Sequence, residues 1–128
     1  MKKRSSSSLR KKKPKNKFET EIWEYYNKEW AYEPERIKYV QPAVNRVYVP
    51  DFKTPKDIYV ECKGYWKYDD RRKHLLIRQQ YPTKRIVLIF YNSRSKITKN
   101  SKTTYGDRCD EHGLEWYCWR HKKPPKEL

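Results

Sequence analysis

The chain has 128 residues and a formal net charge of +16, with 32 Lys and Arg against 16 Asp and Glu. This length allows one domain with a modest core. No apolar run approaches the roughly 20 residues of a membrane span or the apolar segment of a signal peptide, so we expect a soluble, intracellular protein. A balance this basic indicates a polyanionic partner.

The first 17 residues include nine Lys and Arg and no acidic residue. Such a segment cannot bury enough apolar area to offset its ordering entropy, so we predict that residues 1–17 form a disordered basic arm. Contact with nucleic acid, a nuclear address and a solubilising tail are all compatible with this composition.

Residues 18–47 are predicted to contain a helix, a strand and an unusual connector. Apolar side chains recur at helical spacing over residues 18–30, which predicts an amphipathic helix with Glu19 near its start. The helix dipole alone favours a carboxylate there. Residues 36–40 are predicted to be a strand. Residues 42–47 resemble neither a tight turn nor a clear strand, so we expect an extended connector that bridges rather than folds back.

A hairpin is the central prediction. Residues 47–52 and 58–63 are strand-like, and the Pro-Lys-Asp sequence between them favours chain reversal. Antiparallel pairing about this turn places Asp51 opposite Glu61, with Cβ atoms about 4.5–5.5 Å apart. Because side chains alternate along a strand, Lys63 shares their face. The opposite face is then formed by Phe52, Ile58, Val60 and Cys62.

The paired acids of this hairpin predict a metal site. Two carboxylates so close raise each other's pKa unless a cation lies between them. Hard oxygen ligands with open positions suit Mg²⁺. We therefore interpret Asp51 and Glu61, with Lys63 beside them, as a metal site. The alternative is a solvated charged face, where most Asp, Glu and Lys residues are found.

The remaining elements complete the predicted fold. Acidic residues begin a predicted helix over residues 69–80, and the near-continuous apolar run at 85–91 predicts the most buried strand. A basic loop precedes a helix over 104–112 that ends at Gly113, and a last strand covers 114–119. A small mixed β-sheet flanked by helices, an α/β fold, is the natural packing of these elements.

Five motifs together resemble the endonuclease I family of short-tailed phages, which resolves Holliday junctions and belongs to the PD-(D/E)xK nuclease superfamily. The resemblance runs from about residue 18 to about residue 116. The motifs are Tyr39-Val-x-Pro-Ala-x-Asn45, Tyr48-x-Pro-Asp-Phe52, Val60-Glu-x-Lys-Gly64, Asp69-Asp-Arg-x-Lys-His-Leu-Leu-Ile-Arg78 and Tyr105-Gly…Cys109…His112-Gly113.

The resemblance implies an organisation for the whole chain. It implies a nuclease domain over residues 18–119 with a restriction-endonuclease-like core, followed by a basic tail at 120–128. It also implies an intertwined homodimer in which residues 42–47 bridge the subunits. Matching the family's first-helix pattern selects Glu19 rather than Glu21 as a further acidic site residue, and the resemblance implies that it completes the site of the partner chain.

The resemblance further implies the chemistry, which is metal-dependent hydrolysis of phosphodiesters in four-way DNA junctions by paired nicks. Asp51 and Glu61 would be metal-binding carboxylates and Lys63 the catalytic lysine. With the Cys62 carbonyl the two acids would hold one Mg²⁺ or Mn²⁺, and Glu19 would help to hold a second. If the chain is phage-encoded, we expect it in the cytoplasm of the infected cell, or in the nucleus of a eukaryotic host. The candidate contacts to the DNA backbone are Arg71, Arg72, Lys73, His74, Arg94, Lys96 and Lys99.

Three alternatives remain at this stage. The chain could be a non-catalytic nucleic-acid-binding protein, or a nuclease for mismatched or specific sequences. It could also be a zinc module, because Cys109-x-x-His112 and Cys118-x-x-His121 are ligand-like pairs. The short spacing between the pairs and the lack of a CxxC favour buried thiols instead.

Overall fold

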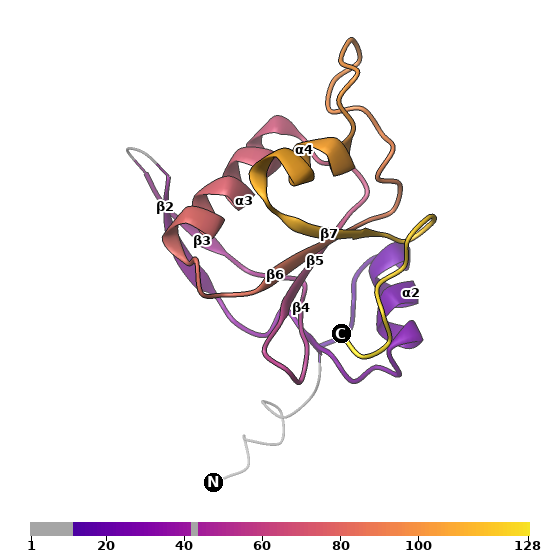
Figure 1. Cartoon of the computed structure of the whole chain (residues 1–128). Helices are drawn as coiled ribbons and strands as arrows, with labels where there is room; N and C mark the ends of the chain where they lie inside the picture. Colours follow the sequence, from indigo (N-terminus) through magenta and orange to yellow (C-terminus); the bar gives the residue numbers. More distant parts are fainter. Residues whose placement is uncertain (1–11, 42–43) are drawn as a thin grey trace, which may run out of the picture.

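A computed structural model of the chain describes residues 12–41 and 44–128 (Figure 1). Most of the predicted basic arm, residues 1–11, lies outside the described residues. No helix in the described ranges is long and apolar enough to cross a bilayer. In chain order the elements are α2 (Lys17–Tyr25), β1 (Ala31–Tyr32), β2 (Ile37–Gln41), β3 (Val44–Tyr48), β4 (Phe52–Lys53), β5 (Tyr59–Lys63), α3 (Tyr68–Gln80), β6 (Ile86–Phe90), α4 (Tyr105–His112) and β7 (Glu115–Cys118).

The main sheet has the strand order β1-β4-β5-β6-β7. The pairs β1–β4 and β4–β5 are antiparallel, whereas β5–β6 and β6–β7 are parallel, which confirms the predicted mixed sheet. Helices α3 and α4 lie on one side of this sheet and α2 lies on the other (Figure 1). Strand β6 is covered on both faces, and Val87 to Phe90 are all buried, as predicted for the apolar run.

Helix α2 is shorter than the predicted helix over residues 18–30. It begins at Lys17 because the Asn16 side chain accepts a hydrogen bond from the Glu19 N–H (2.8 Å) and so acts as the N-cap. It ends at Tyr25, because Asn27 and Lys28 have left-handed φ angles of 58° and 59° that cannot continue a helix.

The prediction of one strand over residues 47–52 is wrong. Strand β3 ends at Tyr48 and the chain restarts as the short strand β4, because Pro50 between them has no N–H to donate to a ladder. The prediction of an extended connector over residues 42–47 is also wrong, because β3 pairs antiparallel with β2 and Gln41 lies opposite Val44. This chain therefore folds back there, although residues 42 and 43 lie outside the described residues. Strand β1 was not predicted.

Helices α3 and α4 differ in how they begin. The predicted acidic cap of α3 is wrong, because Lys67 is the N-cap and makes no side-chain capping bond, so both aspartates fall in the first turn. In α4, Thr104 and Asp107 form a reciprocal capping box. Gly113, with φ 66°, ends α4 in the left-handed region, as predicted.

The C-terminal segment, expected to be a basic tail, packs against the domain. The Tyr26 hydroxyl donates hydrogen bonds to the carbonyls of Pro124 (3.2 Å) and Pro125 (2.9 Å). Leu128 is buried in the cluster that contains Ile22 of α2. Figure 1 shows this segment returning alongside α2.

Candidate active site

The β4–β5 hairpin has the predicted register, with Phe52 opposite Val60. Asp51 comes directly before β4, and its Oδ2 accepts a hydrogen bond from the N–H of Cys62 at 2.9 Å. The apolar face formed by Phe52, Ile58, Val60 and Cys62 packs into the core cluster that α2 covers. The predicted sorting of the two hairpin faces is therefore confirmed.

Glu61 lies in the interior, with only 6% of its surface exposed. Its Oε1 accepts a hydrogen bond from the Tyr48 hydroxyl at 2.8 Å, and its Oε2 lies 3.3 Å from Lys63 Nζ. Burial raises the pKa of Glu61, although Lys63 and Tyr48 act in the opposite direction. The carboxylate is thus held from two sides in an environment that opposes its charge.

Lys63 is held between two acids. Its Nζ lies 3.3 Å from Glu61 Oε2 and 3.4 Å from Asp70 Oδ2, which belongs to the first turn of α3. Burial alone lowers the pKa of Lys63, but the negative charges of Glu61 and Asp70 outweigh it and the pKa is raised. Lys63 is therefore a fixed cation at neutral pH.

Glu19 brings a third carboxylate to the hairpin. It is 7% exposed, and its Oε1 accepts a hydrogen bond from the Tyr32 hydroxyl at 2.7 Å. Burial raises the pKa of Asp51 well above its usual range, and the charges of Glu61 and Glu19 and a hydrogen bond to Glu19 add to this effect. By contrast, Glu21 is exposed and accepts a hydrogen bond from the Trp119 indole. Glu19 is thus the first-helix acid that meets Asp51.

In this single chain, Glu19 and Asp51 belong to the same subunit. The exchange of Glu19 into a partner's site, implied by the resemblance, stays a prediction. An exchange between β2 and β3 would carry α2, β1 and β2 together and would leave the local arrangement of the acids unchanged.

Three residues that shape the site were not singled out from the sequence. Asp70 was interpreted as a helix-capping residue, but it contacts Lys63. Tyr48 and Tyr32 hold the carboxylates of Glu61 and Glu19. A tyrosine two residues before the Pro-Asp motif was visible in the sequence, but no local pattern distinguishes a buried hydroxyl donor from a core aromatic residue.

The acids suit a divalent cation by type and by charge. Within the described ranges, no group of three or more His, Cys, Asp or Glu side chains is already arranged to hold a metal ion. In this chain, Glu61 is engaged by Tyr48 and Lys63, and Asp51 by the Cys62 N–H and Glu19. A cation among these carboxylates would relieve the repulsion that raises the pKa of Asp51. The residues therefore fit Mg²⁺ or Mn²⁺, which would replace some of these contacts.

The candidate DNA contacts divide into exposed and buried residues. Arg72, Arg94, Lys96 and Lys99 are exposed, and Lys73 pairs with Asp70 at 3.5 Å. Arg71 and His74, however, are buried. The guanidinium of Arg71 donates to backbone carbonyls, and burial lowers the pKa of His74 well below its ordinary value. His74 therefore lies in the interior, and Arg71 is mostly buried where it lines a cleft between α3 and α4.

The cysteines do not join the histidines of the proposed zinc pairs. Cys62, Cys109 and Cys118 are free and buried, whereas His112 and His121 are exposed. Cys109 packs with Trp66 and Phe90, and burial raises its pKa. In each Cys-x-x-His pair, therefore, the thiol faces the core while the imidazole faces solvent.

Comparison with known proteins agrees with the motif resemblance and extends it. The model of the phage endonuclease I family matches residues 5–120. Endonuclease I of Escherichia phage T7 is 44% identical over 108 residues, which cover 77% of this chain and 70% of that protein. Endodeoxyribonuclease 1 of Enterobacteria phage T3 is 46% identical over 98 residues, which cover 77% of this chain but only 57% of that protein. This chain therefore belongs to the phage endonuclease I family.

Proposed function

We propose that this chain is a metal-dependent DNA endonuclease that resolves four-way junctions by paired nicks, acting as a homodimer. One observation carries the proposal: Glu19, Asp51 and Glu61, all largely withdrawn from water, converge beside the fixed cation Lys63. The relatives from phages T7 and T3 are an endonuclease and an endodeoxyribonuclease, which supports an endonuclease that acts on DNA.

The acids are assigned to two Mg²⁺ or Mn²⁺ ions. Asp51, Glu61 and the Cys62 carbonyl would hold one ion, and Glu19 would help to hold the other. When bound, the ions supply activation of water and neutralisation of charge on the leaving oxygen. The tyrosine hydroxyls at Tyr48 and Tyr32 keep the carboxylates of Glu61 and Glu19 oriented.

Lys63 acts as a cation rather than as a base. Because Glu61 and Asp70 raise its pKa, it remains protonated at neutral pH. An ammonium group fixed by two acids can donate to a nonbridging oxygen of the scissile phosphate or orient the attacking water. Asp70 is then a positioning residue, because it contacts Lys63 and not the reacting atoms.

The basic surface supports binding through DNA phosphates. The exposed candidates Arg72, Arg94, Lys96 and Lys99 are suited to backbone contacts, which read shape and charge rather than sequence. With about 6–10 phosphates engaged, junction affinity would fall about 10³–10⁵-fold between about 50 and 200 mM salt.

The β2–β3 hairpin supports association with a second chain. Three of its valines are solvent-exposed, namely Val40 (53%), Val44 (43%) and Val47 (40%). A second copy that covers them, by exchange at the β2–β3 turn, would remove this apolar area from water. A two-fold dimer offers two sites that nick two strands of a junction symmetrically.

Nicking of a synthetic four-way junction, beside a linear duplex of the same arm sequences, tests the function. We expect paired nicks in the junction with Mg²⁺, none with a chelator, and little cutting of the linear duplex. Junction binding without nicking would instead indicate the non-catalytic alternative. Equal cutting of both DNAs, or cutting confined to mismatches or one sequence, would contradict junction selectivity.

A further inference from the structure

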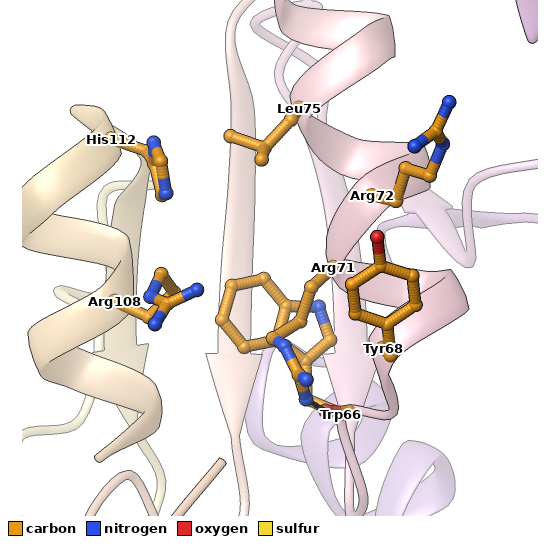
Figure 2. Close-up of a pocket in the computed structure, with 7 residues that line it drawn as sticks. All are labelled: Trp66, Tyr68, Arg71, Arg72, Leu75, Arg108 and His112. Carbon is orange, nitrogen blue, oxygen red and sulfur yellow. Dashed lines mark hydrogen bonds between the residues drawn. The ribbon is translucent and has the colours of Figure 1, made fainter. Parts of the chain in front are cut away.

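A second polar site lies between α3 and α4, separate from the carboxylates. This cleft has a volume of about 170 Å³ and is lined by Trp66, Tyr68, Arg71, Arg72, Leu75, Arg108 and His112. Figure 2 shows Tyr68, Arg71 and Arg72 on α3, with the Arg72 guanidinium directed away from α4, and Arg108 and His112 on α4. It is smaller than the roughly 300–1,000 Å³ of pockets for drug-sized ligands, so it suits a small chemical group.

Consecutive residues of α3 belong to the candidate active site and to the cleft. Asp70, which contacts Lys63, is followed directly by Arg71 of the cleft. None of the cleft-lining side chains makes a hydrogen bond or ion pair with the acids Glu19, Asp51 or Glu61 in the described structure. The two sites are therefore formed by different side chains.

The arginines of the cleft retain unused donors. The Nη1 of Arg71 donates to the carbonyls of Trp66 (2.6 Å) and Ile97 (3.3 Å), while its Nε and Nη2 make no hydrogen bond within the described part of the chain. Arg72 has no carboxylate within ion-pair distance among the described residues. Arg108 pairs with Glu111 at 2.9 Å, but the Glu111 side chain is 54% exposed and competes with water.

A buried donor in the same cleft also lacks a partner. Trp66 is 1% exposed, and its indole N–H makes no hydrogen bond to any residue that the structure describes. A buried donor left unpaired destabilises the fold, because it has lost its hydrogen bond to water without replacement. Because Trp66 lines the cleft, a ligand with acceptor oxygens could supply the missing partner.

The chemistry of the lining selects an anion. Guanidinium and indole groups only donate hydrogen bonds, so they match a ligand that presents acceptor oxygens, as a phosphodiester does. Arginines favour phosphate through paired, charge-assisted hydrogen bonds. The ring of Tyr68 and the side chain of Leu75 add an apolar wall on which a sugar can lie.

We propose that this cleft binds one phosphodiester group of the DNA backbone and so anchors the strand next to the catalytic edge. The inference rests on the proposed DNA substrate. It adds Arg108 and Trp66, which the sequence did not indicate, and gives Arg72 a defined place among the exposed cations.

The test compares Arg72→Gln and Arg108→Gln with Arg78→Gln, a control that removes the same charge from an exposed position of α3 outside this cleft. Junction binding is measured by fluorescence anisotropy in a chelator over a range of salt. We expect each cleft variant to weaken binding about tenfold and to reduce the slope of log affinity against log salt by about 0.9. The control should change neither quantity appreciably.

Two further measurements keep the outcomes distinct. Arg108→Lys, which keeps the charge but not the planar fork, should retain the salt slope while losing affinity. Thermal stability with inorganic phosphate distinguishes a free anion from DNA. A slope unchanged in both cleft variants, even if phosphate stabilises the wild type, would overturn the inference. Mg²⁺-dependent junction nicking by the same proteins would show that the proposed function survives that failure.

Discussion

The carboxylate site and the α3–α4 cleft bury polar groups of opposite charge. Around Asp51, burial and then the charges of Glu61 and Glu19 raise the pKa of Asp51 well above its usual range. Around Trp66, arginines and an unpartnered indole N–H gather with little opposing charge. The first site favours bound cations and the second favours a bound anion, although both include residues from the N-terminal part of α3.

This difference shows why the two sites would have different mutational signatures. Loss of an acid should remove chemistry and leave binding, because carboxylates oppose a phosphate backbone. Loss of a cleft arginine should weaken junction binding and leave the nicking rate of the bound junction unchanged. A variant of either site that lost both nicking of bound DNA and junction binding would contradict this distinction.

The largest expected effect comes from the acids themselves. Asp51→Asn or Glu61→Gln should reduce junction nicking by at least about 10²–10³-fold, because the charge that holds the cations is lost. Junction affinity in a chelator should remain at the wild-type level. Single-turnover nicking and anisotropy on the same preparations measure both, and full nicking by either variant would show that the wrong carboxylates are named.

A subunit-mixing experiment asks whether the acidic site is shared between chains. Glu19→Gln and Asp51→Asn should each be inactive alone. If α2 is exchanged between subunits, a co-expressed heterodimer brings the intact Glu19 of one chain to the intact Asp51 of the other and regains one site. We expect nicking of one strand per junction. Heterodimers that stay inactive would show that each subunit completes its own site.

The support that Tyr48 gives to Glu61 should have an intermediate effect. Tyr48→Phe removes only the hydroxyl that donates to Glu61, and we expect about tenfold weaker Mn²⁺ binding. Tyr39→Phe is the matched control, since Tyr39 is also buried but makes no hydrogen bond to the acids in the described structure. Calorimetric titration with Mn²⁺ measures both, and equal affinities would remove Tyr48 from the site.

The smallest expected effect tests whether His74 belongs to the core or to the cationic surface. Burial, with the charges of Lys63 and Lys73, lowers its pKa in the folded protein. The unfolded chain therefore binds more protons below about pH 6.5, and the free energy of unfolding falls as pH drops. His74→Phe should reduce the loss between pH 8 and pH 5 by up to about 2 kcal/mol. Urea unfolding at the two pH values measures it, and an unchanged difference would place His74 in solvent.

The elements predicted well are those that local patterns specify. The apolar run of β6, the capping of α4 and the register of the β4–β5 hairpin each follow from neighbours in the chain. The alternation that put Glu61 and Lys63 on one face likewise needed only a period of two.

What the sequence did not reveal depends on contacts between distant residues or on single backbone angles. The hydrogen bonds from Tyr48 to Glu61 and from Tyr32 to Glu19 each join residues 13 positions apart. Arg71 looked like one of several surface cations, but its Nη1 donates to the carbonyls of Trp66 and Ile97. The early end of α2 reflects left-handed backbone angles at Asn27 and Lys28, which its apolar spacing does not encode.

The burial of all three thiols has a practical consequence for following junction distortion in real time. Cys62, Cys109 and Cys118 are withdrawn from solvent in the fold, so maleimide dyes should react slowly with the native protein. A single cysteine introduced on the exposed β2–β3 hairpin would then take a fluorophore selectively. Energy transfer to dyes on the DNA arms could report the geometry of the complex without removing any natural thiol.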